Sequence, residues 1–398
     1  MTFSIIIPAY NEEESIKSII ERTEKARSHI IRNTFVDEVE IIVVNDGSTD
    51  KTKEFAQQYE GIKLISYEKN KGYGAAIKLG FEKAQGNILG FLDADGTCDP
   101  LFFSTLINSL VKNESDIAIG SRLGSLSRMP KIRRLGNKIY VTIINFLGNV
   151  SITDSASGMR VLKRKALADL YPLPDGMHFT PAMSCKALMN GKLKIIEEPM
   201  EYKEREGRSK LSVIRDGQQF LKTIIEISLY YKPLKFFSLL GGLLIMAALV
   251  YAIDPIRYYL VYHRIEEFFI YRLISIIVFS LIGINFVLFG LFAQNFLCII
   301  YNKPDIYDSI RNNFLKVLLY PRNLIRAGAF ISILGIVLNW QTVYQYLTTG
   351  KIFLHWVYIL TGAFLLMVGM EIFTFGFLQK ILNMHKERQA FLKNTRDL

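Results

Sequence analysis

The chain has 398 residues, of which 50% are hydrophobic and 21% are charged, and its formal net charge is +11. The high apolar content excludes a disordered chain, and three cysteines without a CxxC spacing exclude a disulfide framework and argue against a zinc module. The basic balance is compatible with nucleic acid, an anionic membrane or a phosphorylated substrate as the partner.

Short β-branched runs alternate with polar, helix-like segments through about the first 165 residues. This alternation predicts an α/β domain around a mostly parallel sheet, with ligands bound beyond the carboxyl ends of the strands. The strands are expected at Phe3–Ile7, Val39–Val44, Lys63–Tyr67, Ile88–Leu92 and Asp116–Ile119.

Acidic side chains follow three of these predicted strands. The first leads into Glu12, the second into Asp46 and Asp50, and the fourth into Asp93 and Asp95. Since side chains on a strand alternate between faces, Asp93 and Asp95 should point the same way, and neighbouring carboxylates repel unless a cation lies between them. A divalent ion with substrate phosphates completing its shell is the natural occupant. Each acid alone could simply cap a turn. This competing interpretation is less favoured because three strand ends carry acids.

The segment Lys71–Ile77 begins like a dinucleotide-binding fingerprint. The third glycine position is occupied by Ile77, and the segment follows the third strand, so a Rossmann cofactor site is disfavoured. The glycines are instead expected to let the backbone approach a phosphate group or to open the helix that follows.

After Lys235 the chain contains four uncharged or nearly uncharged runs long enough to cross about 30 Å of hydrocarbon. We therefore predict four transmembrane helices, and a large buried helical core is the less favoured alternative. The runs are Phe236–Ile253, Leu273–Asn302, Ala327–Gly350 and Ile352–Met370. The predicted organisation is a soluble domain at 1–211, an interfacial amphipathic helix at 212–234, a membrane domain at 235–380 and a tail at 381–398.

Lysine and arginine are concentrated between the second and third runs and in the C-terminal tail. The positive-inside rule therefore predicts that both termini and the soluble domain face the cytoplasm. The membrane is expected to be the cell membrane or, in a eukaryote, that of the endoplasmic reticulum.

Glycines seven residues apart occur in the second and fourth runs, namely Gly283 with Gly290 and Gly362 with Gly369. They predict two helical hairpins packed through small residues, although chance spacing explains them equally well. Association into a homo-oligomer is left open.

The strand-end motifs resemble those of the family 2 GT-A glycosyltransferases. These are Pro8-Ala9-Tyr10-Asn11-Glu12, Val44–Asp50, Asn70–Gly74 and Asp93-Ala94-Asp95. Further along the chain, Asp154–Arg160 and Arg205–Lys210 resemble the polyprenyl-phosphate hexose synthase branch, typified by dolichol-phosphate mannose synthase. The resemblance covers residues 1–235, and it implies a GT-A α/β domain followed by the all-α membrane domain of four helices.

The resemblance also implies a role for each matching residue. Contacts with the donor nucleoside are implied for Pro8, Tyr10, Glu12 and Asp46. Asp93 and Asp95 would hold Mg²⁺ or Mn²⁺ against the donor diphosphate, which makes Asp95 catalytic as well. Arg122 and Arg134 would bind the acceptor phosphate. Asp154 and Arg160 would flank the active centre. A loop that closes over the donor is matched by Arg205, Ser209 and Lys210. The residues after the acidic pair, Gly96–Pro100, depart from the familiar eukaryotic pattern and leave the choice of donor open.

The implied activity is metal-dependent, inverting transfer of a hexose from a nucleotide sugar of the GDP-mannose or UDP-glucose type to dolichyl or undecaprenyl phosphate. Elementary chemistry agrees with a phosphate acceptor, because a phosphate monoester carries about −1.5 to −2 charge at neutral pH and its oxygen is already nucleophilic. No general base is then obligatory, and the enzyme must supply position and charge control. The run Ile139–Thr153 follows a basic segment, and we expect it to face the bilayer and, with Arg134, to guide the lipid phosphate. A core helix explains this run equally well, because it is shorter than a membrane span.

Two alternatives stay open. A hydroxyl acceptor on a glycolipid or polysaccharide would require a base, for which Asp154 is the candidate. A carrier of lipid-linked sugars with a sensor domain would require polar residues at mid-membrane. Nucleic acid is not an expected partner, because the basic residues flank the membrane spans.

Overall fold

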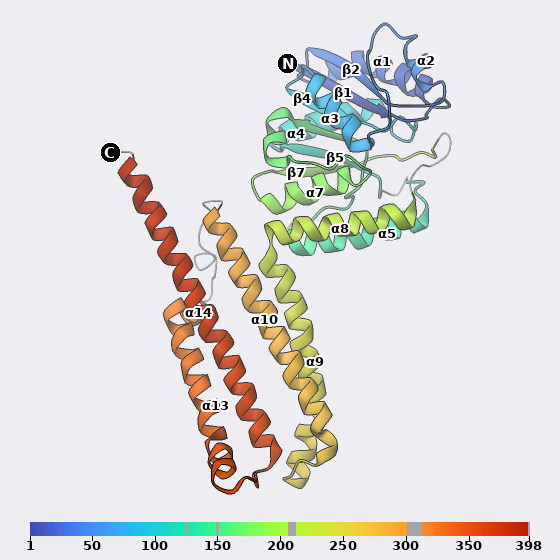
Figure 1. Ribbon diagram of the computed structural model, residues 1–398. Coiled ribbons are helices and arrows are strands. Elements are labelled where there is room, and N and C mark those ends of the chain that lie inside the picture. Colours follow the sequence, from blue (N-terminus) through green and yellow to red (C-terminus); the bar gives the residue numbers. More distant parts are fainter. Residues whose placement is uncertain (125–126, 149–150, 206–211, 301–312, 397–398) are drawn as a thin grey trace. The chain divides into compact units, whose positions relative to one another are not determined.

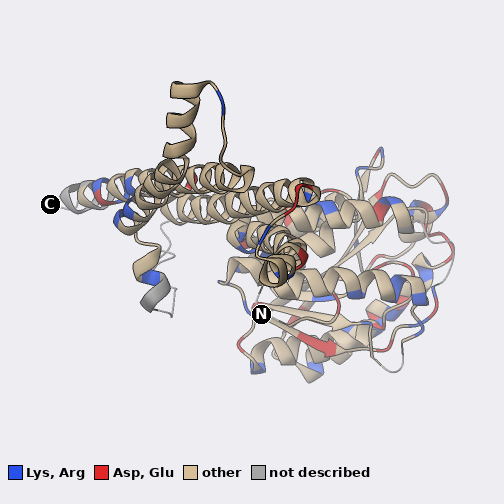
Figure 2. Cartoon of the chain, turned by 90° about the horizontal axis from the view of Figure 1, so that it is seen from below, with Lys and Arg blue, Asp and Glu red and all other residues tan. Residues whose placement is uncertain are grey.

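The computed structural model describes residues 1–124, 127–148, 151–205, 212–300 and 313–396 (Figure 1). The chain forms two compact units, Met1–Tyr231 and Lys232–Leu398. Charged residues, coloured blue and red in Figure 2, are frequent in the first unit and sparse along the long helices of the second.

The described part of the first unit contains a seven-stranded mixed sheet in the order β3-β2-β1-β4-β6-β5-β7. The five predicted strands are present. The strands are β1 (Thr2–Ala9), β2 (Glu38–Asp46), β3 (Lys63–Tyr67), β4 (Ile88–Phe91), β5 (Ile117–Ser121), β6 (Arg160–Lys163) and β7 (Ile195–Pro199). The pairs among β3, β2, β1 and β4 are parallel, whereas β6 is antiparallel to β4 and β5. The carboxyl ends of β1, β2 and β4 therefore meet at one edge, as the sequence predicts.

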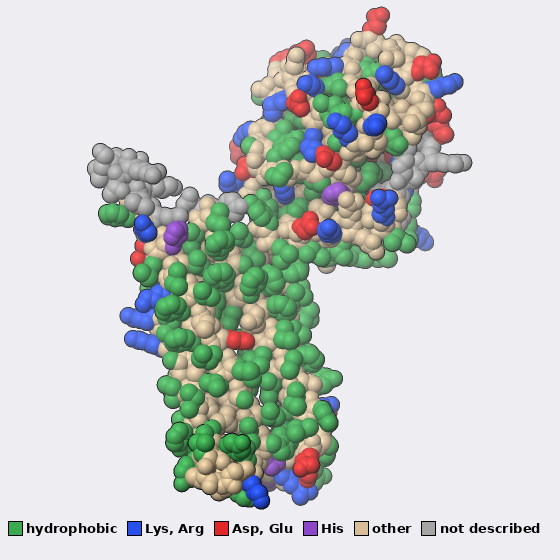
Figure 3. Space-filling view, viewed as in Figure 1, with side chains coloured by type: hydrophobic (Ala, Val, Ile, Leu, Met, Phe, Trp, Pro, Cys, Tyr) green, Lys and Arg blue, Asp and Glu red, His purple; other side chains and the backbone are tan. Residues whose placement is uncertain are grey.

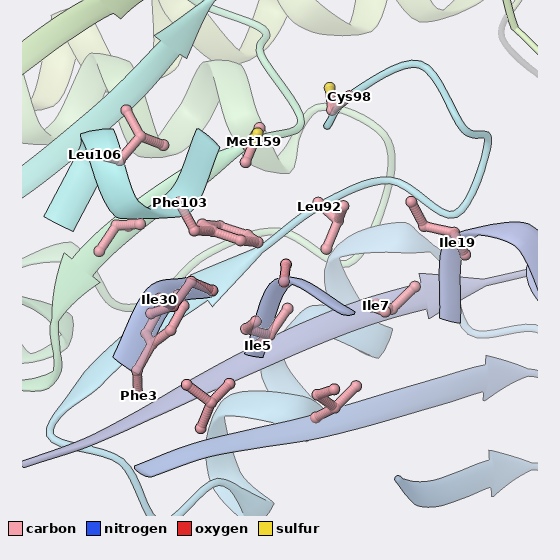
Figure 4. Close-up of a cluster of buried hydrophobic side chains, with 14 of the residues drawn as sticks. Phe3, Ile5, Ile7, Ile19, Ile30, Leu92, Cys98, Phe103, Leu106 and Met159 are labelled. Atoms are coloured by element: carbon pink, nitrogen blue, oxygen red, sulfur yellow. The ribbon is translucent and has the colours of Figure 1, made fainter. Parts of the chain in front are cut away.

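Helices cover both faces of this sheet. They are α1 (Ile16–Asn33), α2 (Thr52–Ala56), α3 (Tyr73–Lys83), α4 (Phe103–Lys112), α5 (Lys131–Gly148), α6 (Leu167–Leu170), α7 (Phe179–Asn190) and α8 (Val213–Tyr231), with 3₁₀ turns at Pro100–Phe102 and Arg164–Ala166. On one face Phe3, Ile5 and Ile7 of β1 pack against α1 and α4 (Figure 4). On the other, Ile6 packs with side chains of α3, α5 and α7. This alternation within one strand buries both faces, so β1 is apolar from Phe3 to Ala9 except at the buried Ser4.

The helix predicted at 212–234 is α8, and part of its apolar surface packs within the first unit. Phe220 is buried, and Ile224 and Ile227 lie in the same buried cluster as residues of α5 and α7. The ring of Tyr140 on α5 lies 5.9 Å from that of Phe220, and its hydroxyl donates to the carbonyl oxygen of Gly217 at 3.0 Å. The amphipathic pattern thus reflects domain packing as well, and contact with a bilayer stays a prediction.

The described part of the second unit has four helices long and apolar enough to cross a membrane, which supports a multi-pass membrane protein. They are α9 (Pro233–Tyr262), α10 (Ile270–Ile300), α13 (Pro321–Thr349) and α14 (Trp356–Arg396), accompanied by the short α12 (Asn313–Leu318) and a 3₁₀ turn at Glu267–Phe269. Hydrophobic side chains cover most of the surface of these helices in Figure 3. A soluble protein does not expose so much contiguous apolar surface.

Glycine permits close packing within each of two helical hairpins. On α10, Gly283 lies against the carbonyl of Gly241 on α9, and on α14, Gly369 lies against Gly328 and Ser332 of α13. The small-residue packing predicted from the glycine spacing is confirmed. Such contacts let backbones approach closely where lipid offers no hydrophobic driving force.

Two adjacent glycines of α9 allow this packing to be tested. A methyl group at Gly241 would lie 2.5 Å from the Gly283 carbonyl oxygen, whereas one at Gly242 would meet nothing within 4 Å. We expect Gly241→Ala to lower the melting temperature in detergent by several degrees, because two backbones must separate. Gly242→Ala should leave it equal or slightly higher, since alanine favours a helix by about 0.5–1 kcal/mol. Equal losses in both variants would contradict this account of the α9–α10 interface.

Candidate active site

The loops that follow β1 and β2 are locked to one another. Asn11 has a left-handed backbone (φ +52°), its Oδ1 accepts from the Thr49 N–H at 2.8 Å, and its own N–H donates to Ser48 Oγ at 3.0 Å. The N–H of Glu12 donates to Thr52 Oγ1 at 2.7 Å. Asparagine tolerates this conformation better than most residues, and its amide can bond locally. Both loops therefore present one fixed surface at the sheet edge.

Asp46, at the end of β2, holds the glycine-rich segment. Its two carboxylate oxygens accept the main-chain N–H groups of Lys71 and Gly72, each at 2.8 Å. Burial raises the pKa of Asp46, and these two bonds oppose the rise. Gly72 has φ +106° and directly precedes α3, which confirms that the glycines open a helix. Methyl groups at Gly72 and Gly74 would clash with the carbonyls of Asp175 and Pro174, so close packing also requires glycine here.

Asp93 and Asp95 lie in a turn beyond β4, which ends at Phe91. The strand alternation invoked from the sequence therefore does not apply to them, and other contacts position them. Asp93 Oδ1 accepts the hydroxyl of Tyr73 at 2.7 Å, and Gly158 leaves room for this carboxylate, which any Cβ there would overlap. Burial, and then repulsion from Asp95, raise the pKa of Asp93 to about 6. The two carboxylates thus interact strongly.

A cation does lie beside this acidic pair, and it is a guanidinium. Arg205 donates from Nη1 to Asp95 Oδ2 at 3.1 Å and from Nη2 to Glu12 Oε1 at 2.5 Å. The other oxygen of Asp95 accepts the hydroxyl of Thr97 at 2.6 Å and its N–H at 3.2 Å. The structure therefore brings together Glu12, Asp95 and Arg205, which the sequence assigned to one site.

Arg122 and Asp154 form a buried, two-pronged ion pair. Arg122 donates from Nε to Oδ2 at 2.7 Å and from Nη2 to Oδ1 at 2.9 Å, and its main-chain N–H adds a third bond at 3.0 Å. Asp154 also accepts from Asn137 Nδ2 at 3.2 Å and from the N–H of Ala156 at 3.1 Å. The pKa of Asp154 is lowered although burial alone would raise it, because Arg122 and these N–H groups outweigh desolvation.

A second arginine lies beneath this pair, where it braces the loop. Arg160, which has no exposed surface, donates to the carbonyl oxygens of Ser157 at 3.0 Å and Ser155 at 2.8 Å, and burial lowers its pKa to about 10. Glu197 of β7 accepts the N–H of Asp154 at 2.9 Å. The loop that carries Asp154 and Gly158 is thus fixed from both sides.

Comparison with known proteins identifies the family of this chain. The family model for glycosyl transferase family 2 matches residues 4–171. A dolichyl-phosphate beta-glucosyltransferase of Trichomonas vaginalis is 32% identical over 231 residues, which cover 53% of this chain and 68% of that protein. This chain belongs to glycosyltransferase family 2. Its first unit is a GT-A domain, followed by the four long apolar helices.

Other relatives agree with this assignment. A dolichol-phosphate mannosyltransferase of Pyrococcus furiosus is 34% identical over 221 residues, covering 53% of this chain and 59% of the relative. The resemblance to the polyprenyl-phosphate hexose synthase branch is thus confirmed. The chain spans between about half and two thirds of the length of such relatives. A solved structure of the glucosyl-3-phosphoglycerate synthase of Mycobacterium tuberculosis, with Mn²⁺, UDP and phosphoglyceric acid, aligns at 23% identity and a TM-score of 0.46, covering 57% of this chain and 78% of that one.

Not every predicted residue of the GT-A domain falls in the acidic cluster. Pro8 is buried within β1, Tyr10 is half-buried in the loop that follows, and Arg134 is exposed on α5. Ser209 and Lys210 lie outside the described residues. The assigned roles of all these residues stay predictions.

Four residues of the site were not singled out for these roles from the sequence. They are Tyr73, Asn137, Gly158 and Glu197. Tyr73 and Gly158 stand inside motifs that the family resemblance quotes, which was a usable signal, and Asn137 lies three residues after Arg134. Glu197 lies in a short apolar-acidic strand with no such marker.

The acidic pair fits a divalent metal only with help from a substrate. Within the described ranges, no group of three or more His, Cys, Asp or Glu side chains could hold a metal ion. Two hard carboxylates that repel each other, Asp93 and Asp95, suit Mg²⁺ or Mn²⁺ when phosphate oxygens complete the shell. The residues present therefore fit a metal that binds together with a diphosphate.

The buried ion pair makes the domain sensitive to Asp154. We expect Asp154→Ala to lower the free energy of unfolding by about 3–5 kcal/mol, or the melting temperature by about 10 °C, because it strands the Arg122 charge. Since the folded-state pKa of Asp154 is lowered, its stabilising effect is present above the ordinary carboxyl pKa and is lost as the pH falls through the folded value. Asp37→Ala, which removes an 82% exposed carboxylate, is the matched control in a thermal melt. An unchanged melt for Asp154→Ala would contradict the assignment of this pair.

Proposed function

We propose that this protein is a metal-dependent, inverting glycosyltransferase that moves a hexose from a nucleotide sugar to a polyprenyl phosphate. The names of its relatives support a dolichyl-phosphate acceptor and a mannosyl or glucosyl donor. The donor is of the GDP-mannose or UDP-glucose type, and the lipid is dolichyl or undecaprenyl phosphate. Inversion follows from the family resemblance.

The observation that carries this proposal is the bonding of Asp154. Both of its carboxylate oxygens accept N–H groups from Arg122, and Asn137 and Ala156 add further bonds. With a lowered pKa and no exposed surface, this carboxylate is poorly suited to remove a proton from a hydroxyl group. A phosphate acceptor requires no such base, since its oxygen is already charged. The geometry therefore favours a phosphate over the hydroxyl acceptor that would have used Asp154.

The chain's own residues then divide between donor and acceptor. Asp93 and Asp95 would hold the metal, which when bound would neutralise charge on the leaving diphosphate. Asp154 orients Arg122, whose guanidinium lies over the Tyr202 ring, 5.5 Å from the ring centre. The positive charge of Arg122 binds the acceptor phosphate. A phosphate oxygen attacks the anomeric carbon as the bond to the nucleoside diphosphate breaks, so no proton has to move. The domain contributes position and electrostatics.

The membrane supplies the acceptor. The four apolar helices place the enzyme in the bilayer that contains polyprenyl phosphate, and the basic C-terminal tail favours an orientation with both termini and the GT-A domain on the cytoplasmic side. Nucleotide sugars then reach the domain from the cytoplasm. Asn295 and Gln379 bond to each other at 2.6 Å between α10 and α14, so this polar pair helps to hold two of the apolar helices together.

The test is a transfer assay in detergent with radiolabelled GDP-mannose, GDP-glucose, UDP-glucose and UDP-galactose and with polyprenyl phosphate as acceptor. It is run with Mg²⁺, with Mn²⁺ and with EDTA. Formation of an acid-labile lipid-linked monosaccharide only when metal is present is the expected result and names the donor. Hydrolysis of the donor without a lipid product would support the donor site but contradict the polyprenyl-phosphate acceptor. Transfer in the presence of EDTA would contradict the metal dependence.

A further inference from the structure

Arg205 places a positive charge beside two acidic side chains of the site, Glu12 and Asp95. Its guanidinium bridges Glu12 and Asp95, two acids on different loops, and all three side chains are at least three-quarters buried, with exposures of 21%, 12% and 8%. A planar guanidinium that donates to two carboxylates forms a strong and geometrically specific contact at this degree of burial. This ion pair therefore contributes much of the charge balance of the site.

The backbone next to Arg205 is held by the same turn that carries Asp95. The N–H of Lys203 donates to the carbonyl oxygen of Thr97 at 3.0 Å, and Thr97 itself donates twice to Asp95. From the other side, Arg22 donates to the carbonyl oxygens of Gly96 at 3.1 Å and Cys98 at 2.8 Å. Both anchors hold main-chain carbonyl groups of the turn, whereas the guanidinium of Arg205 lies at the end of a long, rotatable side chain. The side chain can exchange partners while the turn stays in place.

A divalent ion at Asp93 and Asp95 would meet this guanidinium as a like charge. Coulomb repulsion between neighbouring cations is large away from bulk water, so the metal and the Arg205–Asp95 contact oppose each other. A nucleoside diphosphate changes the balance, because its phosphate oxygens are good acceptors for a displaced arginine. Metal and diphosphate would then each ease the binding of the other.

We propose that Arg205 is an internal substitute for the metal, one that leaves Asp95 when the metal binds and pairs with the donor diphosphate. This rests on the proposed function in that it assumes a metal and a nucleotide at this site. In this exchange Glu12 holds the arginine on the acidic pair in the empty state. The result is that metal binds weakly without nucleotide and tightly with it.

The first experiment measures Mn²⁺ binding to the full-length protein in detergent without nucleotide, by calorimetry and by the spin-resonance signal of free Mn²⁺. We expect Arg205→Gln to bind Mn²⁺ at least about fivefold more tightly than the unaltered protein, the low end of typical coupling between sites. Glu12→Gln should also tighten binding, because it loosens Arg205. The direction of the change in Mn²⁺ affinity for Glu12→Gln decides between the two cases. If Arg205 did not compete with the metal, removing the negative charge of Glu12 would weaken the binding of a cation. Arg32→Gln, which removes an exposed arginine of α1, should have no effect.

The second experiment repeats the titration with GDP and with UDP present. The unaltered protein should gain at least about fivefold in Mn²⁺ affinity with one of them, and Arg205→Gln should lose most of that gain. Arg205→Lys keeps the charge without the fork and should fall between the two. Weaker Mn²⁺ binding by Glu12→Gln, or an equal gain with nucleotide in Arg205→Gln, would overturn the exchange and leave the proposed transferase intact. Absence of Mn²⁺ binding that depends on Asp95 in every variant would overturn both the exchange and the metal dependence.

Discussion

Replacing Asp95 by asparagine is expected to lower the rate of hexose transfer by at least about a hundredfold, while the protein stays folded. The carboxylate lies in the turn after β4 beside Asp93, whose pKa is raised by burial and by repulsion from Asp95. Asparagine keeps the size and accepts the Thr97 hydroxyl, but it removes the charge that would hold a metal against the leaving diphosphate. The measurement is the initial rate of transfer with saturating donor, together with a thermal melt.

Asp99 provides a matched control four residues away. Its side chain is 43% exposed and accepts the Leu101 N–H at 3.1 Å as the cap of a short 3₁₀ turn. Asparagine caps as well as aspartate, so Asp99→Asn should retain the activity of the unaltered protein within about twofold. If both variants lost activity equally, the loss would report disruption of the turn and not the loss of a metal-binding charge.

Strand periodicity was sufficient to locate the acidic edge of the sheet. The strands that end at Ala9, Asp46 and Phe91 contain apolar runs buried on both faces, and parallel pairing brings their carboxyl ends together. The four membrane-spanning runs could be predicted equally directly, because about 20 consecutive apolar residues are typical of a transmembrane helix. Both signals are local in sequence, which is why they could be recognised without a structure.

The contacts that orient the acids are long-range and carry no such signal. Arg205 reaches Glu12 across 193 positions of sequence, and Gly158 makes room for Asp93 from a separate loop. The strand β6 has only four residues, Arg160–Lys163, and is inserted antiparallel between β4 and β5, so neither its existence nor its direction follows from periodicity. Motif matching named Asp154 and Arg122 separately, whereas only the folded chain shows that they form one ion pair.

The amphipathic pattern of α8 illustrates a different limit. One apolar stripe predicts a buried face but does not say whether protein or lipid covers it. Phe220, which lies beside the Tyr140 ring, and Ile224 are covered by the GT-A domain, whereas Ile214 is 77% exposed. Sequence alone could not divide the stripe in this way, because both environments select the same residue types.

The acceptor phosphate is expected to be indispensable. Polyprenol of the same chain length should be used at least about a hundredfold more slowly than polyprenyl phosphate, since a positioned general base contributes about 10²–10⁴ and Asp154 is committed to Arg122. Equal rates with the two lipids would show that a base acts elsewhere in the site and would return the hydroxyl acceptor to first place.

Arg122→Lys refines this test, because lysine keeps the charge but not the two-pronged bond to Asp154. We expect the KM for polyprenyl phosphate to rise about tenfold while the KM for the donor changes less than about twofold, since the fork orients the charge that meets the acceptor. Arg134→Ala, on the exposed face of α5, should raise the acceptor KM less. A rise confined to the donor KM in Arg122→Lys would instead place this arginine on the donor diphosphate, and the acceptor phosphate would then depend on Arg134 and its helix.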